Sequence, residues 1–82
     1  MAIKKIYCII DLNKYTKEDI VKDITNEEYK HNFVFPNTMR LTMEEKAVIL
    51  KECDEVWLFG DCKGINDYGL AFLSGCDLWQ MK

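Results

Sequence analysis

The sequence contains little of what defines several large classes of protein. Its 82 residues include four glycines and one proline, too few for a collagen-like or low-complexity chain. No apolar run approaches the roughly 20 residues of a membrane-spanning helix, and residues 1–5 (MAIKK) are expected to open a strand and not to act as a signal peptide. We therefore expect one compact domain over residues 1–82, in the cytoplasm and with no membrane partner.

A basic cluster is also missing. The 11 lysines and arginines are scattered among 14 acidic residues, and the formal net charge is −3. Binding to a nucleic-acid backbone needs clustered cations that displace the counterions held by the phosphates. We therefore expect no nucleic-acid partner.

The four cysteines lack the spacing of a metal site. No two of them stand at the C-x-x-C spacing that lets one turn present two thiolates, so we expect no metal and no cofactor. Three of them lie within or beside apolar runs, where a free cysteine acts as a small buried hydrophobe. We expect all four to be reduced, with only Cys62 in a loop.

Common nucleotide-binding and hydrolase motifs are absent as well. The sequence has no G-x-x-x-x-G-K-[ST], no G-x-G-x-x-G, no G-x-S-x-G and no H-E-x-x-H. These absences exclude the standard P-loop, dinucleotide-binding, hydrolase-elbow and zinc-protease interpretations.

What is present is a regular alternation of strand and helix signals. Apolar and β-branched runs predict strands over residues 3–12, 32–36, 55–60 and 76–81. The first run is apolar almost throughout, which is typical of a central parallel strand buried on both faces. The second is stopped by Pro36, which has no N–H to continue a strand ladder.

Three helix signals separate these strands. Thr16 begins the first helix, which is expected to end between residues 26 and 30, and a capping box from Thr42 to Glu45 begins the second. Gly75 ends the third. The residues expected to share the apolar faces are Ile20, Val21, Ile24, Met43, Ala47, Leu50, Tyr68, Ala71 and Phe72. This βαβαβαβ order with short connections predicts a three-layer α/β domain, Rossmann-like or flavodoxin-like, with a four-stranded parallel sheet.

In such a sheet, ligands bind beyond the carboxyl ends of the strands. The loops over residues 11–14, 36–40 and 60–67 fall there and are rich in polar residues. Loops are polar in most proteins, so composition alone leaves open a plain surface role. The candidate ligand-binding residues are Asp11, Asn13, Asn37, Thr38, Arg40, Gly60, Asp61, Lys63, Gly64 and Asn66.

Two acids in the third loop are the candidate catalytic residues. Asp61 and Asp67 can supply a nucleophile and an acid/base, as glycosyl chemistry requires. The alternative is a loop carboxylate and a charge that stabilises a helix N-terminus. Arg40 and Lys63 can bind a phosphate, or they can be solvated surface charges.

Several other aromatic and titratable residues are expected to lie outside the predicted ligand site. His31 precedes the second strand at its amino end, opposite the predicted site, and we expect it to be non-catalytic. Trp57 is expected in the core. Trp79 and Met81, on a final edge strand, are candidates for a subunit interface. A chain this short buries only about 60–65% of its unfolded surface, so we expect a homo-oligomer.

The second half of the chain, residues 41–81, resembles the nucleoside 2-deoxyribosyltransferase-like superfamily, including short members common in phage and prophage genomes. The resemblance rests on residues 53–60 (CDEVWLFG), then Gly64, then the pattern D-x-G-x-A-x-x-x-G from Asp67 to Gly75. Family members have Glu at the first position of that pattern. The resemblance implies a nucleoside or nucleotide pocket in a cytoplasmic protein of a bacterial host cell, with the family's nucleophile at Asp67 and pockets completed by a neighbouring subunit.

Three departures from the family pattern favour binding over turnover. Asp67 is one methylene shorter than Glu, and a misplacement of about 1 Å can cost a hundredfold in rate. The spacing from Gly64 to Asp67 is one residue short, and the family's Gly-Pro after the first strand is absent. The prediction is a protein that binds a nucleotide or nucleoside-derived molecule without turnover, such as a phage-type protein that sequesters a nucleotide immune signal. An N-glycosidase or deoxyribosyltransferase that uses Asp67, and a protein-interaction module without a small ligand, are the alternatives.

Overall fold

The computed structural model describes residues 3–26 and 30–81 as one α/β unit. The expected opening at Met1 and Ala2, and the expected helix end among residues 27–29, lie outside the described residues. In chain order the elements are β1 (Lys5–Ile10), α1 (Lys17–Asn26), β2 (Asn32–Val34), a 3-10 turn η1 (Pro36–Thr38), α2 (Met43–Glu52), β3 (Glu55–Phe59), α3 (Asn66–Leu73) and β4 (Leu78–Met81).

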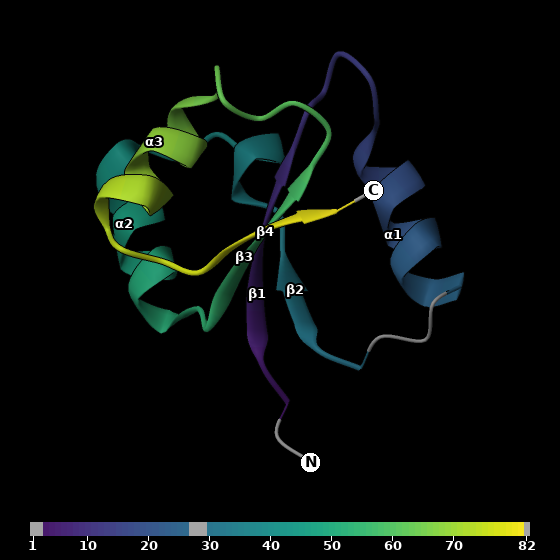
Figure 1. Ribbon diagram of the computed structural model, residues 1–82, viewed down its shortest axis with the longest axis horizontal. Helices are drawn as coiled ribbons and strands as arrows, with labels where there is room; N and C mark the ends of the chain where they lie inside the picture. The colour runs from purple at the N-terminus through teal and green to yellow at the C-terminus, as the bar shows by residue number, and fades with distance from the viewer. Residues whose placement is uncertain (1–2, 27–29, 82) are drawn as a thin grey trace.

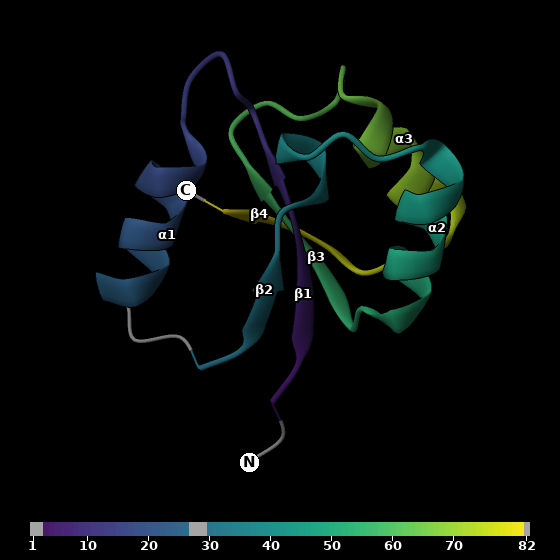
Figure 2. The same cartoon turned by 180° about the vertical axis from the view of Figure 1, so that it is seen from behind.

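The four strands form one parallel sheet in the order β2-β1-β3-β4. Helix α1 lies on one face of this sheet, and α2 and α3 lie together on the other (Figures 1 and 2). This is the arrangement that right-handed crossovers produce, because the connection from β1 to β2 runs in the opposite direction across the sheet from the later ones. The predicted three-layer α/β fold with a four-stranded parallel sheet is confirmed.

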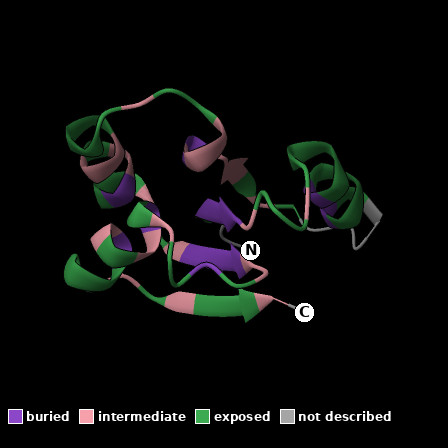
Figure 3. Cartoon of the chain, turned by 90° about the horizontal axis from the view of Figure 1, so that it is seen from above, coloured by how far each residue is buried: buried purple, intermediate pink, exposed green. Residues whose placement is uncertain are grey.

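Strand β1 is the centre of the core, as its apolar sequence predicts. Residues 6–10 have no exposed surface (Figure 3). Tyr7 and Ile9 face α2 and α3, whereas Ile6 and Cys8 pack with Trp57 on the opposite face. Ile10 packs against α1. Every one of these five positions therefore contributes to one of the two apolar layers.

The strands are shorter than predicted. Strand β2 ends at Val34 and not at residue 36, because Pro36, which was expected to end the strand, begins the η1 turn. Strand β4 begins at Leu78 and not at residue 76, because Gly75 takes a φ of +74° and Cys76 donates its N–H back to the carbonyl of Ala71. The turn after α3 therefore consumes the two residues that were expected to open the strand.

Three residues predicted on apolar helix faces are exposed. Val21 and Met43 each retain 41% of their surface, and Phe72 retains 64%. Short helices bury only a narrow stripe, which in α3 consists of Asp67 and Ala71, one turn apart. Phe72 lies beside this stripe and stacks on Tyr68 with ring centroids 6.4 Å apart.

All four cysteines are free, but their placement differs from the prediction. Cys62 does lie in a loop, yet it is buried, with its thiol 3.3 Å from the carbonyl oxygen of Ile9. Cys53 and Cys76 are half-buried and lie just beyond α2 and just before β4, outside the regular elements. Burial raises the pKa of the Cys53 thiol to about 11, so this thiol keeps its proton near neutral pH.

Two classes of feature are not found in the described part of the chain. None of its helices is both long and apolar enough to cross a bilayer. Within residues 3–26 and 30–81 there is also no group of three or more His, Cys, Asp or Glu side chains placed to hold a metal ion.

Candidate functional site

A buried carboxylate joins three elements beneath the carboxyl edge of the sheet. Asp67, in the first turn of α3, is 1% exposed. The hydroxyl of Tyr7, on β1, donates to its Oδ2 at 2.6 Å. The ammonium of Lys46, on α2, donates to its Oδ1 at 2.8 Å. We call Tyr7, Lys46 and Asp67 the buried triad.

Local sequence explains why each member of the triad points inward. Tyr7 occupies the face of β1 that turns toward α2 and α3. Lys46 follows the Thr42 cap by one helical turn and precedes the buried Leu50 by another, so all three lie along one side of α2. Asp67 is the second residue of α3, where the helix dipole favours an acid.

The phenol of Tyr7 keeps its proton within the buried triad. Burial, followed by the hydrogen bond to Asp67, raises the pKa of Tyr7 far above its usual value near 10. The hydroxyl therefore remains a donor at physiological pH. With Lys46 as the second donor, both oxygens of the Asp67 carboxylate are engaged.

Above the triad, the structure forms a pocket of about 290 Å³ at the carboxyl ends of β1 and β3. Two carboxylates, one ammonium, three amides and three aliphatic side chains surround it. The lining residues are Ile10, Asp11, Leu12, Asn13, Asn37, Lys46, Ile65, Asn66 and Asp67. The lining therefore combines polar and apolar side chains, and two members of the buried triad, Lys46 and Asp67, are part of it.

Asn37 fixes one wall of this pocket. Its Oδ1 accepts the backbone N–H of Ile10 at 3.1 Å, and its Nδ2 donates to the Ile10 carbonyl at 2.8 Å. Because β2 ends at Val34, its register with β1 stops at Tyr7. The carboxamide of Asn37 therefore satisfies backbone groups of Ile10 that the shortened β2 does not reach.

Asp11 is positioned by the loops on either side of it. Its N–H donates to the carbonyl of Phe59 at 2.8 Å, and its Oδ1 accepts the N–H of Asn13 at 3.1 Å. Gly60 adopts a φ of +91°, and a Cβ at that position would lie 2.7 Å from the Cβ of Asp11. The close approach of these two loops therefore requires glycine at position 60.

The structure brings together about half of the predicted site residues. Asp11, Asn13, Asn37, Asn66 and Asp67 share the lining of the pocket. Thr38 instead lines a neighbouring hollow of about 420 Å³ together with Tyr15 and Lys17, among others. The residues outside the lining of the 290 Å³ pocket are Arg40, Gly60, Asp61, Lys63 and Gly64.

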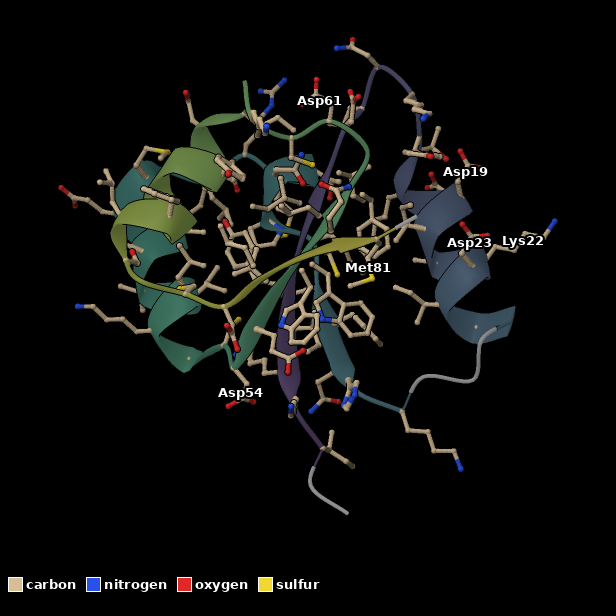
Figure 4. The ribbon with its side chains drawn as sticks, viewed as in Figure 1. Asp19, Lys22, Asp23, Asp54, Asp61 and Met81 are labelled. Atoms are coloured by element: carbon tan, nitrogen blue, oxygen red, sulfur yellow. The ribbon has the colours of Figure 1, made fainter. Side chains whose placement is uncertain are left out.

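Asp61 and Asp67 occupy different environments. Asp61 is exposed on the loop after β3, where it accepts the N–H of Lys63 at 3.4 Å (Figure 4). Asp67 is buried beneath the pocket. Arg40 and Lys63 are both exposed, as the surface-charge alternative expects. His31 lies at the amino end of the sheet, where its Nδ1 accepts the N–H of Lys4 at 3.2 Å.

Sequence analysis missed two of the three triad residues, and each carried a signal. Tyr7 places a hydroxyl in the middle of a strand predicted to be buried on both faces, and a buried hydroxyl needs a partner. Lys46 lies between Met43 and Leu50 on the predicted inward side of α2. A lysine on a core-facing stripe indicates a buried acidic partner.

Comparisons of the chain with protein-family models, with curated proteins and with solved structures find no match. The resemblance of residues 41–81 to the nucleoside 2-deoxyribosyltransferase-like superfamily therefore stays a prediction.

Proposed function

We propose that this protein binds a nucleoside or a nucleoside-derived small molecule in the 290 Å³ pocket, without turning it over. The absence of turnover is supported by one observation: Tyr7 and Lys46 donate hydrogen bonds to both oxygens of Asp67. The location agrees with the rule that open parallel sheets bind ligands beyond the carboxyl ends of their strands.

The state of Asp67 argues against a nucleophile. A carboxylate that attacks a sugar carbon must reach the carbon and share an electron pair with it. Asp67 is 1% exposed, and each oxygen accepts a short hydrogen bond that holds it toward the protein. Its role in this proposal is to hold α2, α3 and β1 in place around the pocket.

The lining favours a ligand with little negative charge. Lys46 is paired with Asp67, which leaves Asp11 as an acid with no cation among the other lining residues. A phosphate inside the pocket would therefore meet a carboxylate, whereas a sugar hydroxyl can donate to it. Asn13 and Asn66 offer amide donors and acceptors for a base edge, and Ile10, Leu12 and Ile65 offer apolar contact.

The size of the pocket agrees with a single small ligand. Small-molecule sites have volumes of about 300–1,000 Å³, and this pocket lies at the lower end. A phosphate on the ligand would have to extend out of the pocket, toward the solvent. This placement leaves room for the nucleotide-derived signal predicted from the sequence, provided that its nucleoside part enters first.

The experiment is to incubate the pure protein with a panel of nucleosides, nucleotides and cyclic nucleotide-derived molecules. The protein is then washed and denatured, and the released molecules are identified by mass spectrometry. We expect an intact nucleoside-containing molecule, close to one per chain. Asp11→Asn should weaken its binding, while Asp61→Asn, which changes an exposed acid outside the lining, should not. An empty protein would overturn the proposal.

An N-glycosidase is the second candidate, because Asp67 does line the pocket as well as anchoring the helices. In this case one oxygen of Asp67 must give up its hydrogen bond. That oxygen then forms a bond to the sugar carbon as the bond between this carbon and the base breaks. Recovery of free base and sugar from the same incubation, lost in Asp67→Asn, would favour the enzyme. Intact ligand recovered after prolonged incubation would exclude it.

A further inference from the structure

The outer edge of the sheet is an unprotected strand. Strand β4 is the last in the order β2-β1-β3-β4, and among residues 3–26 and 30–81 no other strand pairs with its outer side. Proteins protect exposed edges by keeping the edge strand short, or with charged side chains, proline, bulges or covering segments. The sequence of β4, Leu-Trp-Gln-Met, contains no charge and no proline, so this edge is open to pairing.

The backbone of β4 presents two residues to that open edge. Val56 of β3 donates its N–H to the carbonyl of Asp77. In a parallel ladder this makes the odd-numbered residues of β4 bond inward to β3, so Leu78 and Gln80 turn their N–H and C=O groups outward. The side chain of Gln80 bends away from the edge, because its Nε2 donates to carbonyls of Leu58 and Gly60.

An aromatic surface accompanies this edge on the face of the sheet that carries α1. Trp79 is 49% exposed and lies in register beside Trp57. These two tryptophans line a hollow of about 260 Å³ together with Glu55 and Met81, and Met81 lies near the end of β4 (Figure 4). The cluster through which α1 packs on the sheet contains no residue of β4. Figure 3 shows β4 as a largely exposed outer strand.

We propose that a second copy of this chain pairs with β4, antiparallel to it, about a two-fold axis that passes beside Trp79. In this register Leu78 stands opposite the partner's Gln80, and each such pair exchanges both of its backbone hydrogen bonds. Every outward backbone group of Leu78 and Gln80 is used. The two four-stranded sheets become one sheet across the interface.

The same register places the two Trp79 side chains directly opposite each other. They form a non-hydrogen-bonded pair, in which Cα atoms approach to about 4.5 Å and side chains are closest. Because Trp57 flanks Trp79 in each copy, the result is a continuous row of tryptophans on one face. An isologous contact needs a surface that complements itself. Here each copy presents both the half-exposed Trp79 and the 260 Å³ hollow that Trp79 helps to line.

The distribution of charge allows two copies to associate through β4. Each chain has a net charge of −3, which opposes association through most of its surface. Strand β4 is uncharged, and Glu55 at its hollow is paired with Lys4 at 2.6 Å. Two copies can therefore meet along β4 without placing like charges opposite each other.

The test is the native mass, measured by light scattering from low micromolar to near-millimolar concentration. We expect twice the 9.7 kDa of one chain at high concentration. Trp79→Asp, which sets two carboxylates face to face on the axis, should raise the dissociation constant by at least about tenfold. Leu73→Asp is the matched control, because Leu73 is 85% exposed on α3 and should leave the dimer intact.

Amide hydrogen exchange tests the mode of pairing. The N–H groups of Leu78 and Gln80 should exchange slowly in the dimer and rapidly in Trp79→Asp, while the amides of β1 stay protected in both proteins and report that the fold is retained. A mass of one chain at every concentration would overturn the proposal. The outer edge of β4 would then be available only for pairing with a strand of a different protein. A dimer that Trp79→Asp does not weaken would overturn it as well.

Discussion

Lys46 and Asp67 form a buried ion pair that links α2 to α3, with 2.8 Å between Nζ and Oδ1. The side chains are 12% and 2% exposed, so water does little to screen the two charges. The Tyr7 hydroxyl, which donates to the other oxygen of Asp67, connects the pair to the central strand. The buried triad therefore joins the helix pair to the sheet by polar contacts directly under the pocket.

Removal of Lys46 should destabilise the fold strongly. Lys46→Met leaves Asp67 buried with its charge unpaired, and loss of one partner of a buried pair costs about 3–5 kcal/mol. Urea unfolding measures this change. Lys51→Met, an exposed lysine on the same helix, should change stability by less than about 0.5 kcal/mol. Equal effects of the two substitutions would show that the pair contributes nothing.

A double-mutant cycle isolates the pair itself. Lys46→Met combined with Asp67→Asn should cost less than the sum of the two single substitutions, because the double variant leaves no unpaired charge. Additive costs would mean that the two side chains act independently, in conflict with the 2.8 Å contact.

Tyr7 should make stability depend on pH in the alkaline range. Its pKa is raised in the folded protein, chiefly by burial, so above the unfolded value of about 10 the unfolded chain releases a proton that the folded chain retains. The free energy of unfolding should then fall as the pH rises, by up to about 1.4 kcal/mol per pH unit. Tyr7→Phe should lack this part of the slope, whereas Tyr68→Phe should keep it. Identical slopes in all three proteins would contradict the assignment.

Asn37 should stabilise the end of β1. Asn37→Ala leaves the N–H and C=O of Ile10 without the carboxamide, and an unsatisfied buried group costs about 1–3 kcal/mol. Thermal unfolding measures the loss. Asn13→Ala, at an exposed position on the same pocket, should have little effect on stability but should weaken ligand binding. If both variants unfold like the wild type, the Asn37 side chain does not hold β1.

Local patterns were sufficient to predict the fold. The apolar run around Ile6 to Ile10 predicted a central strand, and all five residues are fully buried. The capping box at Thr42 and Glu45 predicted the start of α2, and both of its hydrogen bonds are present. These signals act over a few residues, so the sequence alone carries them.

The buried triad could not be predicted in the same way. Tyr7 and Asp67 are 60 positions apart and Lys46 and Asp67 are 21 apart. Their meeting depends on how α2 and α3 cross over β1, which no local pattern contains. The position of Asp67 at the end of the polar loop over residues 60–67 marks it as a candidate, but its partners belong to other elements. The exposure of Phe72 has the same origin, because the packing of α3 decides which side of the helix is covered.

Gly60 provides the sharpest test of how the pocket is assembled. Its φ of +91° and the 2.7 Å separation between a Cβ there and the Cβ of Asp11 both exclude a side chain. Gly60→Ala should therefore cost about 1–3 kcal/mol in strain and should displace Asp11, which weakens ligand binding. Gly64→Ala is the matched control for both measurements, because a Cβ at this position of the same loop would have no atom within 4 Å. If Gly60→Ala lowers stability but leaves affinity unchanged, Asp11 does not contact the ligand and the proposed orientation of the sugar is wrong.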